Sequence, residues 1–408
     1  MSYDKEPGSP RLKIDELNGR NKIENIYIYI ISGFSSFIEK LAPYLRQVIR
    51  FLFLPYAYVF LIDWKVCKKS KIGVLKDFLY IFFVFKTFPD HYQQCRLWEK
   101  KPREWALYWG SNYNPFQRRS LFRVLQPPKY RVVYEDKRLC HDICVLNGIP
   151  TPKEYKIVAP GENMEGVVRR LVETSSNLSK RIVVKPVNGK GGHSIIFFEV
   201  SGSEIHSLFS SSRKSTHAVE SMIVQECIEQ HKYLNQVSKS INTVRFVTAL
   251  DKSEQVVELG AYMRFGSCSS LIDNLSKGGL AVKIDIEKGC LVCPGQNIAG
   301  KSFSEHPDSG VLFKDFAIPY WDQVRSLAST VQKKMNYHRI LGMDIAITDS
   351  GPVIIEINSI YDNVGLEGIC GPLFSRKDIY ELFMSYKLFF CKRQILLIEK
   401  WHASFGVK

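Results

Sequence analysis

The chain has 408 residues and a mass of 47.0 kDa, and its 45% hydrophobic and 24% charged residues are ordinary for a globular protein of two or three domains. Its ten cysteines form no even framework, and nothing resembles a cleavable secretory signal, which excludes a disulfide-stapled secreted fold and leads us to expect a reducing, cytoplasmic setting. The single Cys290-Leu-Val-Cys293 pair lacks a second pair at zinc spacing, so a zinc site is not expected.

The net charge of +15 is concentrated in the N-terminal third, where residues 1–129 carry 22 Lys and Arg against 11 Asp and Glu. Residues 1–22 mix Pro, Gly and both charge signs, and we expect a flexible tail there. In residues 23–129 the two apolar runs, 48–64 and 78–85, are shorter than the roughly 20 uninterrupted residues of a membrane-spanning helix. The pattern predicts a basic, aromatic-rich, mainly helical region.

Two roles fit this basic region. It could lie on an anionic membrane surface, with apolar side chains on one side and Lys and Arg on the other. Alternatively, it could form a helical layer packed on the body of the protein or on a second subunit. No recognised nucleic-acid motif accompanies the charge, so nucleic acid is not an expected partner.

A Gly-rich loop between two short strands is the most phosphate-like stretch. The β-branched runs at 181–185 and 194–200 predict the strands, and the loop between them contains Lys190, Gly191 and Gly192. Glycines allow tight turns whose N–H groups point at an anion, and the lysine adds a positive charge. The loop could fold over phosphates, although a plain surface hairpin fits the same residues.

Polar side chains in three further predicted strands are candidate ligand contacts. One strand ends in Gln225 and Glu226, which could lie along an adenine or simply finish the strand. Two later strands each hold one arginine, Arg245 and Arg264. An arginine inside an apolar strand needs either a protein carboxylate or a ligand anion as its partner, and both alternatives are open.

The strongest single pattern is a predicted β-hairpin near the C-terminal end. Two β-branched runs flank the turn formers at 349–352, and with Ser350 at the centre Asp344 lies opposite Glu356. Alternation along the strands puts Asn358 on the face of these carboxylates. A hard divalent cation would relieve their repulsion, whereas a solvated outer face is the alternative. The other face is expected to hold Ile345, Ile355 and Ile357.

Taken in order, these pieces resemble the ATP-grasp superfamily, and in particular the sugar-transfer associated ATP-grasp family, which is related to α-L-glutamate ligases. The resemblance covers roughly residues 130–370. It is carried by Asn242-Thr-Val-Arg245, Asp273-Asn-Leu-Ser-Lys-Gly-Gly279, His306-Pro-Asp-Ser-Gly310, Ile318-Pro-Tyr-Trp321, Gly342-Met-Asp344 and Glu356-Ile-Asn358. It implies an α+β fold in which two subdomains grip ATP. The expected division is a tail at 1–22, a helical region at 23–129, an ATP-grasp domain at 130–375 and a C-terminal helix at 376–408.

The resemblance also implies ATP with two Mg²⁺ ions and a role for each candidate residue. Asp344, Glu356 and Asn358 would hold the metal ions. Arg245 and Arg264 would steady the transferred phosphoryl group and an acyl-phosphate intermediate. The implied nucleotide contacts are Lys137 and Lys185 on the phosphates, Lys190, Gly191 and Gly192 in the loop over them, and Gln225 and Glu226 along the adenine.

The activity implied is that of an ATP- and Mg²⁺-dependent ligase joining a carboxylate to an amine, on a sugar or polysaccharide precursor at the cytoplasmic face of a membrane. The alternatives are a kinase that phosphorylates a glycan or lipid-linked hydroxyl, and a non-catalytic scaffold for glycan assembly. Two departures bear on the acceptor pocket. Gly342 and Met343 stand where better-known ligases of the superfamily have an arginine near Asp344, and Ile360-Tyr361 stands where Pro-Gly often follows the Glu-x-Asn.

Overall fold

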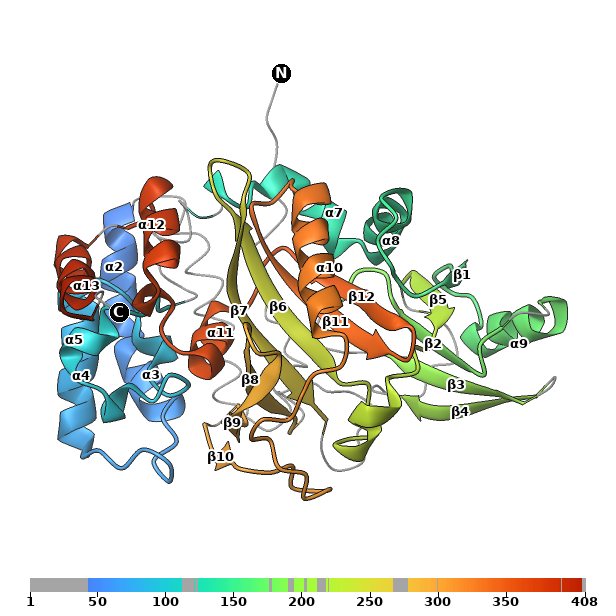
Figure 1. Cartoon of the computed structure of the whole chain (residues 1–408), viewed down its shortest axis with the longest axis horizontal. Helices are drawn as coiled ribbons and strands as arrows, with labels where there is room; N and C mark the ends of the chain where they lie inside the picture. Colours follow the sequence, from blue (N-terminus) through green and yellow to red (C-terminus); the bar gives the residue numbers. More distant parts are fainter. Residues whose placement is uncertain are drawn as a thin grey trace.

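The protein is described from a computed structural model, and its elements are labelled in Figure 1. The predicted tail and the loop residues Lys190, Gly191 and Gly192 lie outside the described residues. The chain forms an α+β fold with two antiparallel sheets and an N-terminal helical region, as the sequence predicts. The structure describes residues 43–111, 121, 124–175, 178–189, 194–201, 204–210, 218, 220–266, 278–298, 300–389 and 391–405.

A seven-stranded antiparallel sheet lies at the centre of the molecule (Figure 1). Its alternating residues form two faces of different character. One face is apolar, with Phe246, Met263 and Met343 packed against Val324 and Val331 of helix α10. In sheet order the strands are β10 (Ser302–Phe303), β9 (Cys290–Gln296), β8 (Leu280–Asp285), β7 (Val256–Phe265), β6 (Thr243–Leu250), β11 (Ile340–Thr348) and β12 (Gly351–Asn358), and the helix is α10 (Trp321–Lys334).

A smaller five-stranded antiparallel sheet is covered on one face by helix α9. Ile182, Val184 and Val224 on that face pack with Val167 and Val168 of the helix, so the opposite face of the sheet is turned away from its own core. The strands in order are β1 (Glu154–Val158), β5 (Met222–Glu226), β2 (Arg181–Pro186), β3 (Ile196–Ser201) and β4 (Glu204–Ser210), and the helix is α9 (Met164–Thr174).

Helix α8 leads into the small sheet, at the place where the sequence from Lys137 to Cys144, with Gly148 as a stop signal, predicts a helix. It spans Lys137–Leu146, and the carboxylate of Asp136 accepts hydrogen bonds from the first free N–H groups of the helix. Gly148 follows its end with a φ of 64°, which a residue with a side chain rarely adopts. The short helix α7 (Val132–Glu135), with the 3₁₀ turn η4 (Pro128–Tyr130), lies just before it.

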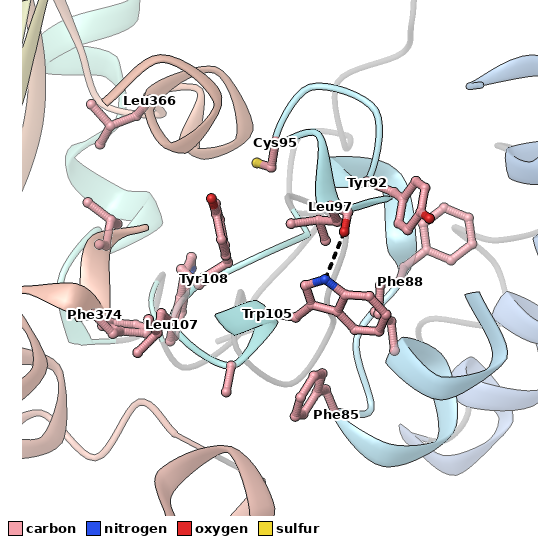
Figure 2. Packing of buried hydrophobic residues seen from close by; sticks show 14 of the residues in the cluster. Phe85, Phe88, Tyr92, Cys95, Leu97, Trp105, Leu107, Tyr108, Leu366 and Phe374 are labelled. Atoms are coloured by element: carbon pink, nitrogen blue, oxygen red, sulfur yellow. Dashed lines mark hydrogen bonds between the residues drawn. The ribbon is translucent and has the colours of Figure 1, made fainter. Parts of the chain in front are cut away.

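The N-terminal helices and the C-terminal helices share one hydrophobic cluster, which also contacts the central sheet. Figure 2 shows Trp105 and Tyr108 of the N-terminal region in the same cluster as Leu366 and Phe374 from the C-terminal part, and Trp105 donates a hydrogen bond to the Leu97 carbonyl. The elements are α2 (Pro43–Leu52), α3 (Leu54–Phe60), α4 (Lys71–Val84), η2 (Pro89–His91), η3 (Leu97–Glu99), α5 (Pro102–Trp105), α11 (Asn363–Cys370), η7 (Leu373–Ser375), α12 (Lys377–Ser385) and α13 (Lys392–Phe405). A short 3₁₀ turn, η5 (Lys232–Gln236), follows the small sheet.

The described part of the basic region therefore forms a helical layer packed on the body of the protein, because residues 54–125 contribute many buried side chains to this cluster. Buried polar contacts add to the packing. Gln394 of α13 donates hydrogen bonds to the carbonyls of Ala106 and Tyr108, and Glu367 of α11 accepts from the N–H groups of Trp109 and Gly110 at 2.7 and 3.0 Å. Within the described ranges, no helix is long and apolar enough to cross a membrane.

The expected single C-terminal helix is wrong in one respect, since the segment forms two helices, α12 and α13. The chain turns at Lys387, whose φ is 55°. This turn lets Phe383 of α12, Leu388 after it and Ile398 of α13 all reach the shared cluster, and one straight helix through the segment would have lacked that bend.

Candidate nucleotide and metal site

The predicted hairpin is β11 and β12, and its expected register is correct at the carboxylates. Asp344 pairs with Glu356, and Gly342 pairs with Asn358. The turn is tighter than predicted, because Thr348 pairs with Gly351 around Asp349 and Ser350. A β-bulge next to Asp344 then restores the expected pairing.

The bulge corrects the prediction for the apolar face. Ile345 and Ile357 are buried as expected, but Ile354 takes the buried place that was predicted for Ile355. Two residues of β12 face one residue of β11 at the bulge, so the alternation shifts by one position.

Pairing across the sheet places five polar side chains in one row. Glu356 pairs with Asp344, Asp344 with Arg245, Arg245 with Tyr262, and Tyr262 with Lys283. Residues paired directly across strands share a face, so the row crosses strands β12, β11, β6, β7 and β8 on the face opposite α10. The predicted carboxylates therefore lie at one end of a mixed-charge strip.

Asp344 is the partner of both predicted arginines. Arg245 donates from Nη2 to Oδ2 at 3.2 Å and from Nε to Oδ1, while Arg264 approaches Oδ2 at 3.0 Å. Arg264 also donates to the Thr243 hydroxyl. Burial opposes ionisation of Asp344, but the two guanidinium groups outweigh it and hold its pKa below its usual range. In this structure, then, both arginines pair with a protein carboxylate.

An arginine of the neighbouring strand, Arg245, borders the space beside Gly342 and Asp344. A Cβ on Gly342 would lie 3.7 Å from Cδ of Arg245 and only 2.9 Å from Cβ of Tyr361. The glycine thus leaves room for Tyr361, a residue at the second departure from the superfamily pattern. The two departures are therefore neighbours in space.

Lys137 connects the loop after β2 with the β11–β12 hairpin. Its Nζ donates to the Gly189 carbonyl and lies 3.5 Å from Oε1 of Glu356. Lys185 of β2 is close enough for its charge to interact with both Lys137 and Glu356. Burial, reinforced by repulsion from Lys137, lowers the pKa of Lys185 to about 8. The free face of the small sheet and the charged face of the large sheet therefore meet at these two lysines.

Gln225 lies on the same face of the small sheet as Lys185, because Gln225 pairs with Val183 and Lys185 pairs with Ile223. Its side chain is buried, and within the described part of the chain its Oε1 accepts no hydrogen bond. Glu226 has a different contact. Its Oε1 accepts a hydrogen bond from the Lys153 N–H at 2.9 Å, which links the end of β5 to the residue just before β1. Of the two predicted adenine contacts, Gln225 is the one on the sheet face that carries Lys185, and it has a side-chain oxygen available for a ligand there.

A small pocket opens beside Glu356 and Asn358. Asn358 carries a buried Nδ2 that makes no hydrogen bond to any described residue. The pocket is lined by Tyr134, Glu135, Gly189, Glu356, Ile357, Asn358, Ser359 and Ile360. Glu356, the last residue of the polar row, therefore lies in the same pocket as Gly189, which precedes the predicted phosphate loop.

The donor set suits a hard divalent cation, since Asp344, Glu356 and Asn358 offer carboxylate and amide oxygens on one face. The surrounding charge is nevertheless positive. Asp344 and Glu356 are outnumbered by Arg245, Arg264, Lys137 and Lys185, so a bare cation meets four positive side chains. Such a site favours a cation that arrives together with a polyanion.

Two residues of this row, Tyr262 and Lys283, are not among the predicted site residues. Lys283 of β8 makes no hydrogen bond or ion pair with any part of the chain that the structure describes, and its neighbour Tyr262 is buried. The available signal was a lysine after the apolar run Leu280–Val282 of the predicted strand. Its relation to Arg245 depends on the order of three strands, which the local sequence does not specify.

Two α+β parts that meet at Lys185 and Glu356 define an ATP-grasp protein. A model of the sugar-transfer associated ATP-grasp family matches residues 116–371, more than half of the sequence, and the chain belongs to this family. No curated protein matches the sequence.

Three solved structures show a low similarity to this chain. D-alanine-D-alanine ligase from Helicobacter pylori is 11% identical, with 66% of this chain and 62% of that chain covered and a TM-score of 0.36. The ATP-grasp ligase PsnB, in complex with minimal precursor, Mg and ADP, is 17% identical, with 64% and 61% covered and a TM-score of 0.33. N5-carboxyaminoimidazole ribonucleotide synthetase from Thermotoga maritima is 13% identical with a TM-score of 0.33; the match covers 59% of this chain but only 46% of that one.

Proposed function

We propose that the protein is an ATP- and Mg²⁺-dependent ligase that joins a carboxylate to an amine on a sugar or polysaccharide precursor. The observation that carries the proposal is the charge balance of the site, where two facing carboxylates and an amide lie among four cationic side chains. The family name supports an association with sugar transfer. PsnB, a ligase with the same fold, is described with Mg and ADP.

In this proposal Lys137 and Lys185 bind the phosphates of ATP. An incoming phosphate would replace the Gly189 carbonyl and Glu356 as partners of Lys137, and it would relieve the repulsion between the two lysines. Lys190, Gly191 and Gly192 would cover the phosphates, and Gln225 with Glu226 would border the adenine. Asp344, Glu356 and Asn358 would hold two Mg²⁺ ions, which would supply positive charge to offset that of the phosphates.

The reaction would proceed in two displacements. A substrate carboxylate oxygen attacks the γ-phosphorus of ATP, and ADP leaves with the electrons of the broken P–O bond. An amine then attacks the acyl carbon, phosphate leaves, and the amine loses a proton to give the amide. Arg245 and Arg264 hold Asp344 in place and present a positive edge to the transferred phosphoryl group, so the protein contributes alignment and electrostatics.

The compartment in the proposal is the cytoplasm, in agreement with the thiols. Every cysteine in the described ranges is free, including the Cys290 and Cys293 pair. The activity requires no redox partner.

The test is the thermal midpoint of the full chain with ATP, with Mg²⁺ and with both, for the wild type and Glu356→Gln. Ligand at about 100 times its dissociation constant adds roughly 2.7 kcal/mol to stability, which is easily measured as a shift. We expect a shift only with Mg²⁺ and ATP together, and none in the variant. Glu173→Gln, an exposed position on α9, is the matched control.

Product analysis then separates the enzyme classes. A ligase releases phosphate and forms an amide, whereas a kinase leaves phosphate on a hydroxyl of the acceptor. No thermal shift in the wild type would contradict the nucleotide site and favour the scaffold role. A shift retained in full by Glu356→Gln would contradict the metal role of this hairpin.

A further inference from the structure

Helix α4 is apolar on the side that packs into the protein and also on the side that does not. Val74, Phe78 and Ile81 are fully buried in the shared hydrophobic cluster. Ile72, Leu75 and Phe83 form a second stripe at helical spacing, and they are exposed by 69%, 44% and 59%. A helix that is apolar all round normally buries both sides. The outer side of α4 therefore lacks a partner among the described residues.

Helices α2 and α3 extend this stripe. Val48, Leu52 and Val59 repeat at intervals of four and seven residues and are all exposed. Helices α2 and α3 follow each other and lie alongside α4. The Phe51 ring of α2 is 5.8 Å from the Phe83 ring near the end of α4, and the Tyr58 hydroxyl of α3 donates to the Lys71 carbonyl at the start of α4. We call the exposed side chains of residues 48–86 the α2–α4 face.

The charge of the α2–α4 face has one sign. Its exposed charged residues are all lysines, at positions 65, 68, 71, 76 and 86. The two acidic residues of this segment are occupied: Asp77 is buried and bonded to Lys69 and the Tyr92 hydroxyl, and Asp63 accepts from the Lys65 N–H. Exposed apolar stripes flanked by lysines, without exposed carboxylates, suit a surface that is apolar inside and anionic outside.

The face is also well placed for such a surface. Figure 1 shows α3 and α4 at one end of the molecule, with the small sheet and α9 at the other and the central sheet between them. Contact at this end is therefore made by a different part of the molecule from the pocket at Gly189 and Glu356.

We propose that the α2–α4 face binds an anionic lipid bilayer. The apolar side chains enter the headgroup region, and the lysines contact lipid phosphates. The contact in this proposal is with one leaflet of the bilayer, and the described parts of α2, α3 and α4 include no helix long and apolar enough to cross it. This proposal is independent of the ligase reaction proposed above.

The experiment is co-sedimentation of the full chain with vesicles of phosphatidylcholine alone and of phosphatidylcholine with about 30 mol% phosphatidylglycerol. We expect binding to the anionic vesicles at about 0.05 M salt, with strong loss at about 0.5 M, where charges are screened over a few ångströms. Leu75→Glu with Phe83→Glu should abolish binding. The matched control is Leu146→Glu, an exposed leucine on α8 far from this face, which should bind as the wild type does.

A second set of variants keeps the test decisive if the first set is unstable. Lys65→Gln, Lys68→Gln and Lys71→Gln should each lower the partition coefficient about fivefold, since a lysine near an anionic surface contributes about that factor. Lys156→Gln and Lys180→Gln, exposed on the small-sheet part, should not change it.

Three results would overturn the proposal. One is absence of binding by the full chain, which would mean that other residues, such as 1–42, cover the face. Another is equal binding to neutral and anionic vesicles at both salt concentrations. The third is a wild-type dimer in sedimentation equilibrium that Leu75→Glu with Phe83→Glu converts to a monomer, with no vesicle binding by either, which would make the face a contact between two copies of this chain.

Discussion

Arg245 and Asp344 are 99 positions apart in the sequence, yet they pair directly across neighbouring strands and share two hydrogen bonds. With Arg264 also on Asp344, the carboxylate expected to bind metal has two protein cations as its partners. Asp344 is therefore both a candidate metal ligand and the counter-charge for two largely buried guanidinium groups. Variants at this position report on the fold as well as on the chemistry.

We predict that Asp344→Asn lowers the free energy of unfolding by about 3 to 5 kcal/mol, because it removes the negative charge that two largely buried arginines share. Urea denaturation of the ligand-free protein measures the change. Glu356→Gln should cost far less, since Glu356 is 29% exposed and forms its ion pair with Lys137 at 3.5 Å. Equal stability of the two variants would show that the arginines do not depend on Asp344.

Lys185→Met should stabilise the ligand-free protein and abolish its response to Mg²⁺ and ATP. The native pKa of Lys185, about 8, lies below the ordinary value of 10.5, so protonation opposes folding. The penalty is complete below pH 8 and disappears as the pH rises towards 10.5, because in that window the unfolded chain holds the proton and the native chain does not. At pH 7 we expect a gain of about 1 to 3 kcal/mol.

Thermal and urea unfolding at pH 7 and pH 10, with and without Mg²⁺ and ATP, check this prediction. Lys180→Met, an exposed residue just before β2, is the control and should change neither stability nor the nucleotide response. A destabilised Lys185→Met protein would mean that the lysine is held by favourable contacts in the ligand-free state.

Glu367 should make stability fall as the pH rises. Burial raises its pKa to about 7, against the opposing effect of N–H donors from Gly110, Trp109 and Leu373. Between about pH 4.5 and pH 7 the native state holds a proton that the unfolded chain has released. The contribution of this group therefore decreases by up to about 1.4 kcal/mol per pH unit and is constant above pH 7.

The measurement is the free energy of unfolding from pH 4.5 to pH 8 for the wild type, Glu367→Gln and the control Glu173→Gln. Glu367→Gln should remove this part of the pH dependence. It should also cost about 1 to 3 kcal/mol at pH 7, because an amide N–H₂ would face backbone donors between the helical layer and α11. Parallel pH profiles for wild type and variant would falsify the assignment.

Gly342→Ala should destabilise the protein by about 1 to 3 kcal/mol, because the new Cβ would lie 2.9 Å from Cβ of Tyr361. Since Arg245 borders the same space, the variant should also reduce the Mg²⁺- and ATP-dependent thermal shift. Gly166→Ala in α9 is the control: its Cβ would meet nothing closer than 3.6 Å, and we expect a neutral or slightly stabilising effect. Similar results for the two variants would mean that the space beside Asp344 adapts.

Local patterns in the sequence were sufficient to predict the β11–β12 hairpin and helix α8. The turn formers and the period of two specify that Asp344 faces Glu356, and both signals act within a few residues. The same reasoning located the Lys185 strand and the end of α8 at Gly148. It placed Ile355 in the core, however, because a bulge has no clear signature in this run of β-branched residues.

The tertiary structure alone decided how these pieces meet. Strand β6 lies beside β11 because the large sheet buries Phe246 and Met343 against α10. In that arrangement Arg245 pairs directly with Asp344. The described N-terminal helices join α11–α13 through a shared apolar cluster that no local period encodes. Alternation and turn chemistry act over a few residues, whereas strand order and layer packing follow from burying apolar surface contributed by distant segments.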